Sequence, residues 1–221
     1  MRPTTIPAMA RAAAPDRRRD ADRTRQEILD VATREFAERG FAGARVDDIA
    51  ERTRTTKRMI YYYYGSKDQL FVAVLERAYA EIRAAEQTID VDHLDPAAAI
   101  RRLAELTFDH QESHPDFSRL VAIENIHRAE HIDGRGDFAG QNSPAIELIE
   151  RILKRGYRDG SFRREIDAVD LHMMISAFCV FRMANRHTFG AIFERDPADP
   201  ALRGRYRQML GDMVVGYLRG V

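Results

Sequence analysis

The fold of this chain is most tightly constrained by residues 46–64, where two short amphipathic segments flank a tight break. Apolar residues recur at helical spacing in the first segment, which predicts a short helix with one buried face. These residues are Val46, Ile49 and Ala50. After the break at Thr53-Arg54-Thr55, the hydroxyl of Thr56 can accept a backbone N–H and begin a second helix. The stretch therefore predicts two short helices joined by a tight turn.

The second short helix places Ile60 and Tyr64 four residues apart, facing inward, and displays cations and phenols on its other faces. A helix of this kind fits the major groove of DNA, where side chains near its N-terminus reach base edges while phenols and amines hold phosphates. The alternative is a solvated amphipathic helix whose tyrosines fill a small core.

Residues from Thr24 to about Tyr79 resemble the DNA-binding domain of TetR-family transcriptional repressors. The resemblance covers about a quarter of the chain, in ordered blocks. The blocks are Thr24–Asp30, Phe36–Phe41, Val46–Ala50 and Ile60–Leu70. The resemblance implies a helix-turn-helix domain in a homodimer that binds DNA and is controlled by a small-molecule effector.

The chain departs from the family pattern at the turn, where Arg54-Thr55 replace a glycine and an apolar residue. A residue other than glycine is strained at positive φ, so a different turn geometry is expected here. Tyr63 stands where the family often has histidine. Arg58 and Met59 occupy positions of small residues and should alter which bases are read.

Residue types and the resemblance together assign roles at the expected DNA surface. Arg58 and Met59 are expected to read bases. Auxiliary contacts are expected from Arg45 and Thr56. Thr24 and Arg25 lie near the expected start of the first helix, where free N–H groups favour phosphate. Phosphate contacts are also expected from Lys57, Tyr61, Tyr62, Tyr63 and Lys67.

Charge is unevenly distributed, although Lys+Arg 35 balances Asp+Glu 35. Residues 1–70 hold 15 basic and 11 acidic side chains and the rest hold 20 and 24, so a mildly basic head precedes an acidic body. The single cysteine, Cys179, cannot form an internal disulfide, and a cytoplasmic location is expected. No apolar run suits a membrane span or a signal peptide, so no membrane partner is expected.

An all-α chain of three regions is expected. Residues 1–20 are expected to be a disordered basic arm, in which Arg17, Arg18 and Arg19 either reach DNA or stay solvated. Residues 21–66 form the three-helix helix-turn-helix domain, and residues 67–221 form a helical effector-binding and dimerisation domain. Its first helix, over about 67–88, is the connector between the two domains. Further helices are expected over about 95–114, 115–132, 168–193 and 200–221, and one more from Ser143 to Gly156 or Gly160.

The last two expected helices carry more apolar surface than one buried stripe requires. A second copy of the chain is the economical partner, packed through a two-fold four-helix bundle. Simple burial within one chain is the alternative. The sequence therefore predicts a homodimer formed through these helices.

A small apolar effector is expected among the helices of the second domain, which is rich in Phe and Met. Contacts are expected from Phe108, Phe117, Glu124, His127, Met174, Phe178 and Phe181. Core packing is the alternative for the aromatic residues, and a polar core network is the alternative for Glu124 and His127. Histidines four apart, at 110 and 114 and at 127 and 131, are joined by no cysteine or tight carboxylate motif, so neither a metal nor another cofactor is expected.

No phosphate-binding glycine loop, nucleophile elbow or paired-carboxylate signature is present, which argues against an enzyme. The sequence predicts a homodimeric repressor that binds a palindromic operator in double-stranded DNA and is released by its effector. A helical small-molecule binding protein without DNA activity and a transcriptional activator are the alternatives.

Overall fold

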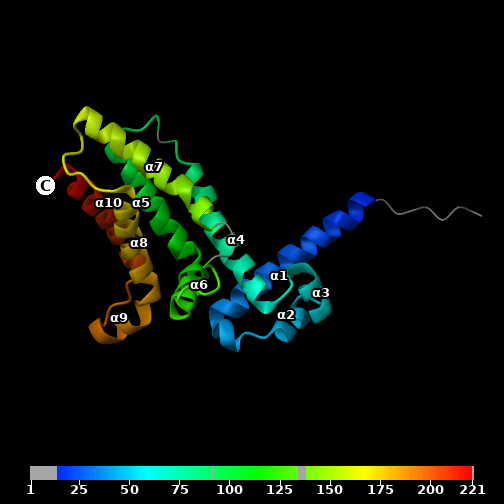
Figure 1. Cartoon of the computed structure of the whole chain (residues 1–221). Coiled ribbons are helices and arrows are strands. Elements are labelled where there is room, and N and C mark those ends of the chain that lie inside the picture. Colours follow the sequence, from blue (N-terminus) through cyan, green and yellow to red (C-terminus); the bar gives the residue numbers. More distant parts are fainter. Residues whose placement is uncertain (1–13, 91, 134–137, 221) are drawn as a thin grey trace, which may run out of the picture.

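The computed structural model describes residues 14–90, 92–133 and 138–220, and these ranges hold ten α-helices, one 3-10 helix and no strand (Figure 1). The all-α prediction is confirmed for this part of the chain. A small head and the connector comprise α1 (Ala14–Gly43), α2 (Val46–Arg52), α3 (Lys57–Tyr64) and α4 (Lys67–Gln87). The larger body comprises α5 (Pro96–Ser113), α6 (Pro115–Ile126), α7 (Phe138–Asp159), α8 (Ala168–Ala184), α9 (Arg186–Phe193), η1 (Pro200–Leu202) and α10 (Arg203–Arg219).

The short helices of the head begin where the sequence predicts. Thr56 accepts a hydrogen bond from the backbone N–H of Met59 at 3.2 Å, which satisfies a free amide at the start of α3. Ser66 accepts the N–H of Gln69 at 3.1 Å and begins α4 in the same way. One buried cluster joins all four helices and includes Ile28, Phe36, Ile49, Ile60, Leu70 and Phe71. This shared core fixes α3 against α1 and α4.

The turn between α2 and α3 keeps a positive φ although it contains no glycine. Arg54 has a φ of 52°, a left-handed conformation that costs a residue with a Cβ about 1–2 kcal/mol. Three backbone amides of the turn donate to carbonyls of α2 at 3.0–3.1 Å and hold it in place. The expected change of turn geometry is therefore wrong for this dihedral angle.

Helix α1 begins at Ala14 rather than near residue 21. The expected disorder is therefore wrong for residues 14–20, while residues 1–13 lie outside the described part of the chain. Pro15 is tolerated because the first helical turn has no hydrogen bond to lose. Ion pairs one turn apart add support, since Arg23 pairs with Asp20 at 3.2 Å.

Two body helices end earlier than their apolar periodicity predicts. The helix expected to reach residue 132 ends at Ile126 because the Glu124 carboxylate accepts the backbone N–H groups of His131 and Ile132, at 2.9 and 3.2 Å. The helix expected over 168–193 breaks at Asn185 into α8 and α9. Asparagine is a poor residue for a helix interior because its side chain competes for backbone hydrogen bonds.

Helix α7 begins at Phe138, ahead of the expected start at Ser143-Pro144. Pro144 lies inside the helix, where the missing N–H removes one backbone hydrogen bond. Of the two expected ends, Gly156 and Gly160, the structure has the second, since Gly160 follows the last helical residue with a φ of 77°.

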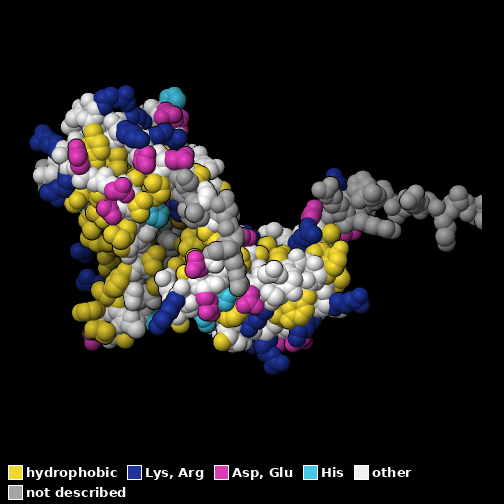
Figure 2. Space-filling model, in the orientation of Figure 1, with side chains coloured by type: hydrophobic (Ala, Val, Ile, Leu, Met, Phe, Trp, Pro, Cys, Tyr) yellow, Lys and Arg dark blue, Asp and Glu magenta, His cyan; other side chains and the backbone are white. Residues whose placement is uncertain are grey.

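The body packs around a second buried cluster, while one side of α8, α9 and α10 remains exposed and apolar (Figure 2). The cluster includes Ile100, Phe108, Ile149, Ile152, Leu171, Leu210 and Leu218. The exposed apolar side chains on the three helices are Val169, Met173, Phe181, Ile192, Phe193 and Met213. We call these six residues the apolar face.

None of the described helices combines the length and the apolar character that crossing a bilayer requires.

Candidate nucleic-acid interface

Helix α3 is fixed to the head by its inner side chains. Ile60 is fully buried in the head core. The hydroxyl of Tyr64 donates to the carbonyl of Arg25 on α1 at 2.8 Å. Burial raises the pKa of Tyr64 to about 12, so the phenol stays protonated and remains a donor. These anchors leave the opposite side of α3 facing outward.

The outward side of α3 carries the residues that the sequence assigns to DNA. Tyr62 is 76% exposed, and Tyr61 and Met59 are 37% and 36% exposed. Lys57 and Arg58 are also exposed. The exposed side chains of α3 therefore present polar and aromatic groups on the head, and Arg45 is exposed directly before α2.

Three cations of this surface already have local partners. The ammonium of Lys57 lies 3.0 Å from a carboxylate oxygen of Asp47, which raises the pKa of the lysine. The guanidinium of Arg25 lies 5.1 Å from the centre of the Tyr63 ring. The ammonium of Lys67 lies 4.8 Å from the centre of the Phe41 ring, and burial lowers the pKa of this lysine.

The helix-start argument for phosphate at Thr24 and Arg25 is wrong. Because α1 begins at Ala14, both residues lie well inside the helix, where backbone N–H groups are already bonded. The Thr24 hydroxyl donates to the carbonyl of Asp20 at 2.8 Å. Arg25 nevertheless lies at the candidate DNA-binding surface, because its guanidinium contacts the Tyr63 ring on α3.

Comparison with known proteins matches both halves of the chain. Residues 28–74 match the family described as bacterial regulatory proteins, tetR family. Residues 96–214, more than half of the chain, match the tetracyclin repressor-like C-terminal domain. The HTH-type transcriptional repressor NicS of Pseudomonas putida is 34% identical over 203 residues, which cover 92% of this chain and 96% of NicS. The chain belongs to the TetR family. It is therefore a helix-turn-helix DNA-binding transcriptional regulator.

Other TetR-family proteins agree with this assignment. The HTH-type transcriptional repressor SCO4008 of Streptomyces coelicolor is 38% identical over 108 residues, covering 49% of this chain and 53% of that protein. The structure of the putative transcriptional regulator SCO4942 from the same species superposes with a TM-score of 0.64 at 28% identity. That match covers 86% of this chain and 97% of the other.

The seven expected effector contacts of this TetR-family chain lie in three separate places. Phe108 and Phe117 are buried, with Phe108 3.9 Å from the Arg182 guanidinium carbon and Phe117 beside Tyr79. Glu124 and His127 lie at the end of α6, next to the head. The other three line an apolar groove of about 600 Å³ beside the apolar face, and these are Met174, Phe178 and Phe181.

Glu124 organises a polar network and also lines a small cavity of about 150 Å³. Besides two backbone amides, its carboxylate pairs with the buried His131 ring, with 2.8 Å between Oε2 and Nδ1. The His131 ring contacts Phe41 and Phe71 of the head, with ring centres 4.3 and 5.0 Å apart. The sequence alternative of a core network is confirmed for Glu124, and that network joins the body to the head.

Metal-binding groups do not gather in the described residues. His110 and His114 stack with ring centres 4.1 Å apart, but no set of three or more His, Cys, Asp or Glu side chains there could hold a metal ion.

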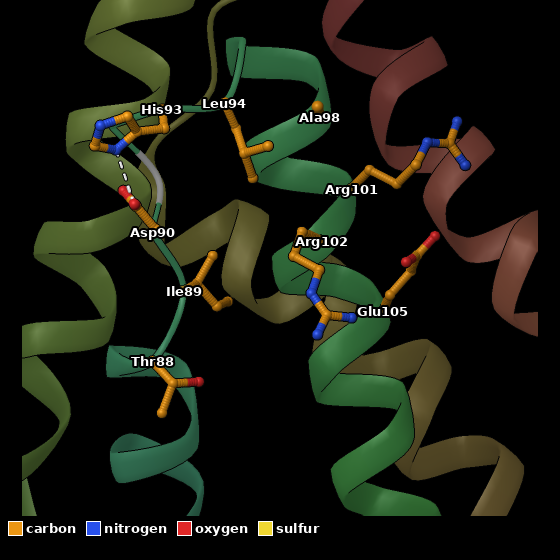
Figure 3. Close-up of a pocket in the computed structure, with 9 residues that line it drawn as sticks. All are labelled: Thr88, Ile89, Asp90, His93, Leu94, Ala98, Arg101, Arg102 and Glu105. Carbon is orange, nitrogen blue, oxygen red and sulfur yellow. Dashed lines mark ion pairs between the residues drawn. The ribbon is translucent and has the colours of Figure 1, made fainter.

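An open cavity of about 510 Å³ lies where the α4–α5 connection meets α5 (Figure 3). Ile89 and Leu94 point into it (Figure 3). Four of its lining side chains already have partners. Arg101 bonds to Asp212 of α10, His93 bonds to Asp90, and Glu105 pairs with Arg207 at 2.9 Å.

Two candidate functional residues were not predicted from the sequence. Arg83 and Glu86 of α4 resemble an ordinary exposed pair one turn apart, yet they are only 7% and 3% exposed. One signal was available, because Glu86 follows Ile82 by four residues and continues the stripe of Phe71 and Leu75.

Proposed function

We propose that this TetR-family chain is a homodimeric repressor that binds a palindromic operator and is released by a small-molecule effector. The observation that carries the proposal is the outward surface of α3, which displays Lys57, Arg58, Tyr61 and Tyr62 while Ile60 and Tyr64 anchor the helix from behind. In a dimer, two such helices enter successive major grooves about 34–36 Å apart.

The exposed side chains of the head take distinct roles in this proposal. Arg58 and Met59 read base edges, with Arg45 and Thr56 beside them. Phosphates are held by Lys57, Tyr61, Tyr62, Tyr63 and Arg25. Lys67 contributes by packing on Phe41 and adding positive charge near the backbone of the DNA. Thr24 acts as a helix residue only, since its hydroxyl is bonded within α1.

The apolar face supports the homodimer. Met173 is 61% exposed and Phe181 is 51% exposed, and large apolar patches of this kind mark interaction sites. A two-fold interface buries the same patch on both copies. Met174, Phe178 and Phe181 belong to this interface in our proposal, rather than to the effector pocket.

The head and the body act as the two domains of the proposed regulator, divided near Ser66. The first turns of helix α4 pack into the head core through Leu70 and Phe71, and the helix ends in the body at Gln87. The Glu124–His131 network adds a second contact between the domains. An effector that shifts α4 against the body would change the spacing of the two heads and release the operator. We place the regulator in the cytoplasm and assign it no enzymatic activity.

Fluorescence anisotropy with genomic fragments tests the proposal. Binding should weaken steeply as salt rises, because phosphate contacts release counterions. Tyr62→Ala should weaken binding to all sequences alike, whereas Arg58→Ala should lose about 1–3 kcal/mol of discrimination at one base pair.

The control is Lys154→Ala, which removes an exposed cation of α7 far from the head. Loss of DNA binding in this variant, or unchanged binding in both α3 variants, would contradict the assigned surface.

A further inference from the structure

An incompletely satisfied ion pair is buried between α4 and α7. Nη1 of Arg83 lies 2.9 Å from Oε2 of Glu86. Nevertheless Nε and Nη1 of Arg83, and Oε2 of Glu86, make no hydrogen bond to any described residue. Buried polar groups are nearly always hydrogen-bonded, because an unpaired one keeps its full desolvation cost. The free donors of Arg83 therefore call for an acceptor that the described residues do not supply.

A cavity of about 210 Å³ adjoins this pair. Arg83 and Glu86 form its polar wall, and Ile89, Pro144 and Leu148 form its apolar wall. Arg151 of α7 stands exposed at its rim. Glu147 also lines the cavity and is already engaged with a partner. The volume lies below the range of about 300–1,000 Å³ that is usual for drug-sized ligands, so only a small molecule fits.

The charge around Arg83 favours an anion. Burial raises the pKa of Glu86, whose carboxyl pairs with Arg83. Burial and the charge of Arg83 both lower the pKa values of His110 and His172. Arg83 is therefore a buried cation, and burial shifts the pKa values of Glu86, His110 and His172 toward the neutral forms of these groups.

We propose that this cavity binds a small organic carboxylate that accepts hydrogen bonds from Arg83 and packs its apolar part on Ile89, Pro144 and Leu148. The inference rests on the proposed function, for which this molecule would be the effector. It replaces the purely apolar effector expected from the sequence with an acid. Since Arg83 lies on α4, which begins in the head, occupancy of the cavity acts directly on the connecting helix.

Isothermal titration calorimetry of the full-length protein tests the site with propionate, cyclohexanecarboxylate and benzoate, and with benzamide as the neutral counterpart of benzoate. At least one carboxylate should bind, and benzoate should bind at least about ten-fold more tightly than benzamide. Arg83→Gln should weaken carboxylate binding about ten-fold or more, because charge-assisted hydrogen bonds are lost. Glu86→Gln should strengthen it, because a competing carboxyl group is removed.

General loss of folding would weaken carboxylate binding in both variants. Weaker binding in Arg83→Gln together with stronger binding in Glu86→Gln therefore cannot arise from unfolding. Arg102→Gln is the matched control, since it removes an arginine that lines the cavity of Figure 3 but not the cavity beside Arg83. The inference is overturned if all three carboxylates fail to bind at about 10 mM. It is also overturned if benzamide binds as well as benzoate, or if Glu86→Gln weakens binding.

A parallel titration of the protein–DNA complex separates this inference from the proposed function. Protein that holds DNA but binds none of the carboxylates contradicts only the cavity assignment. Protein that binds a carboxylate through Arg83 but ignores DNA contradicts the repressor and leaves the cavity assignment standing. Carboxylate that releases DNA from the wild-type protein, but not from Arg83→Gln, supports both.

Discussion

Glu124 shows at the scale of a single residue how one buried carboxylate can shape a helix end and a domain contact. Its oxygens accept two backbone amides and pair with the His131 ring. Glu124→Gln keeps an acceptor but loses the charge-assisted contact, so the free energy of unfolding should fall by about 1–3 kcal/mol in urea titrations.

The control for this prediction is Glu130→Gln. Glu130 pairs with His127 at 3.1 Å, but its side chain is 63% exposed, and exposed pairs contribute at most about 1 kcal/mol. Equal losses in the two variants would show that burial of Glu124 is not what matters.

His110 gives the body a pH-dependent stability. Burial, His114 and Arg83 lower its pKa from 6.5 to about 4, so the unfolded chain binds the proton more readily than the folded chain. Its contribution is complete above pH 6.5 and disappears as the pH falls toward 4. The full loss is on the order of 3 kcal/mol, of which about 2 kcal/mol falls between pH 7.5 and 5. His110→Gln should reduce this difference in urea titrations at the two pH values.

His93→Asn is the control for the pH prediction. Asp90 raises the pKa of the exposed His93, so removing this histidine should leave the loss of stability at low pH in place. A wild-type protein equally stable at both pH values would contradict the role given to His110.

At the scale of the element, the stability of helix α3 depends on its N-cap residue, Thr56. Thr56 satisfies the N–H of Met59, and Thr56→Ala should lower the free energy of unfolding by about 1 kcal/mol. DNA affinity should fall as well, because the frayed first turn carries Lys57 and Arg58. Thr55→Ala, one residue away and without a capping role, should change neither quantity in calorimetry and anisotropy. A larger effect from Thr55→Ala would argue against the cap.

The sequence predicted those helix boundaries that are set by a capping residue next to the boundary. Thr56, Ser66 and Gly160 act on their own helices, and the predicted boundaries there are confirmed. The end of α6 escaped prediction because it depends on Glu124 capturing amides seven and eight residues away. Apolar periodicity alone continues through such a reversal of the chain.

The same distinction holds for the candidate sites. The exposed face of α3 follows from helical spacing around Ile60, so its residues could be read from the sequence. The expected effector contacts could not be grouped, because Phe108, His127 and Phe178 carry no mark of which cavity they face. Arg83 was missed because the packing of α7 over α4, which buries it, is a tertiary contact.

At the scale of the whole molecule, the proposed homodimer depends on the apolar face. Phe181→Glu places a charge at the centre of the proposed interface, where it would be buried without a partner. Sedimentation should show a shift from dimer to monomer, with loss of tight operator binding. Ile126→Glu is the control, since Ile126 is 78% exposed on α6 and lies outside the apolar face. A monomeric wild-type protein, or an unchanged dimer in Phe181→Glu, would contradict this interface.

The central claim is that α3 enters the major groove twice in each dimer. A hydroxyl-radical footprint on a genomic fragment selected by the protein at low salt tests it most directly. We predict two protected regions on one face of the duplex, related by two-fold symmetry and centred about 34–36 Å apart or a multiple of that distance. A fragment that shows no protection, or a single unpaired region, would contradict the account.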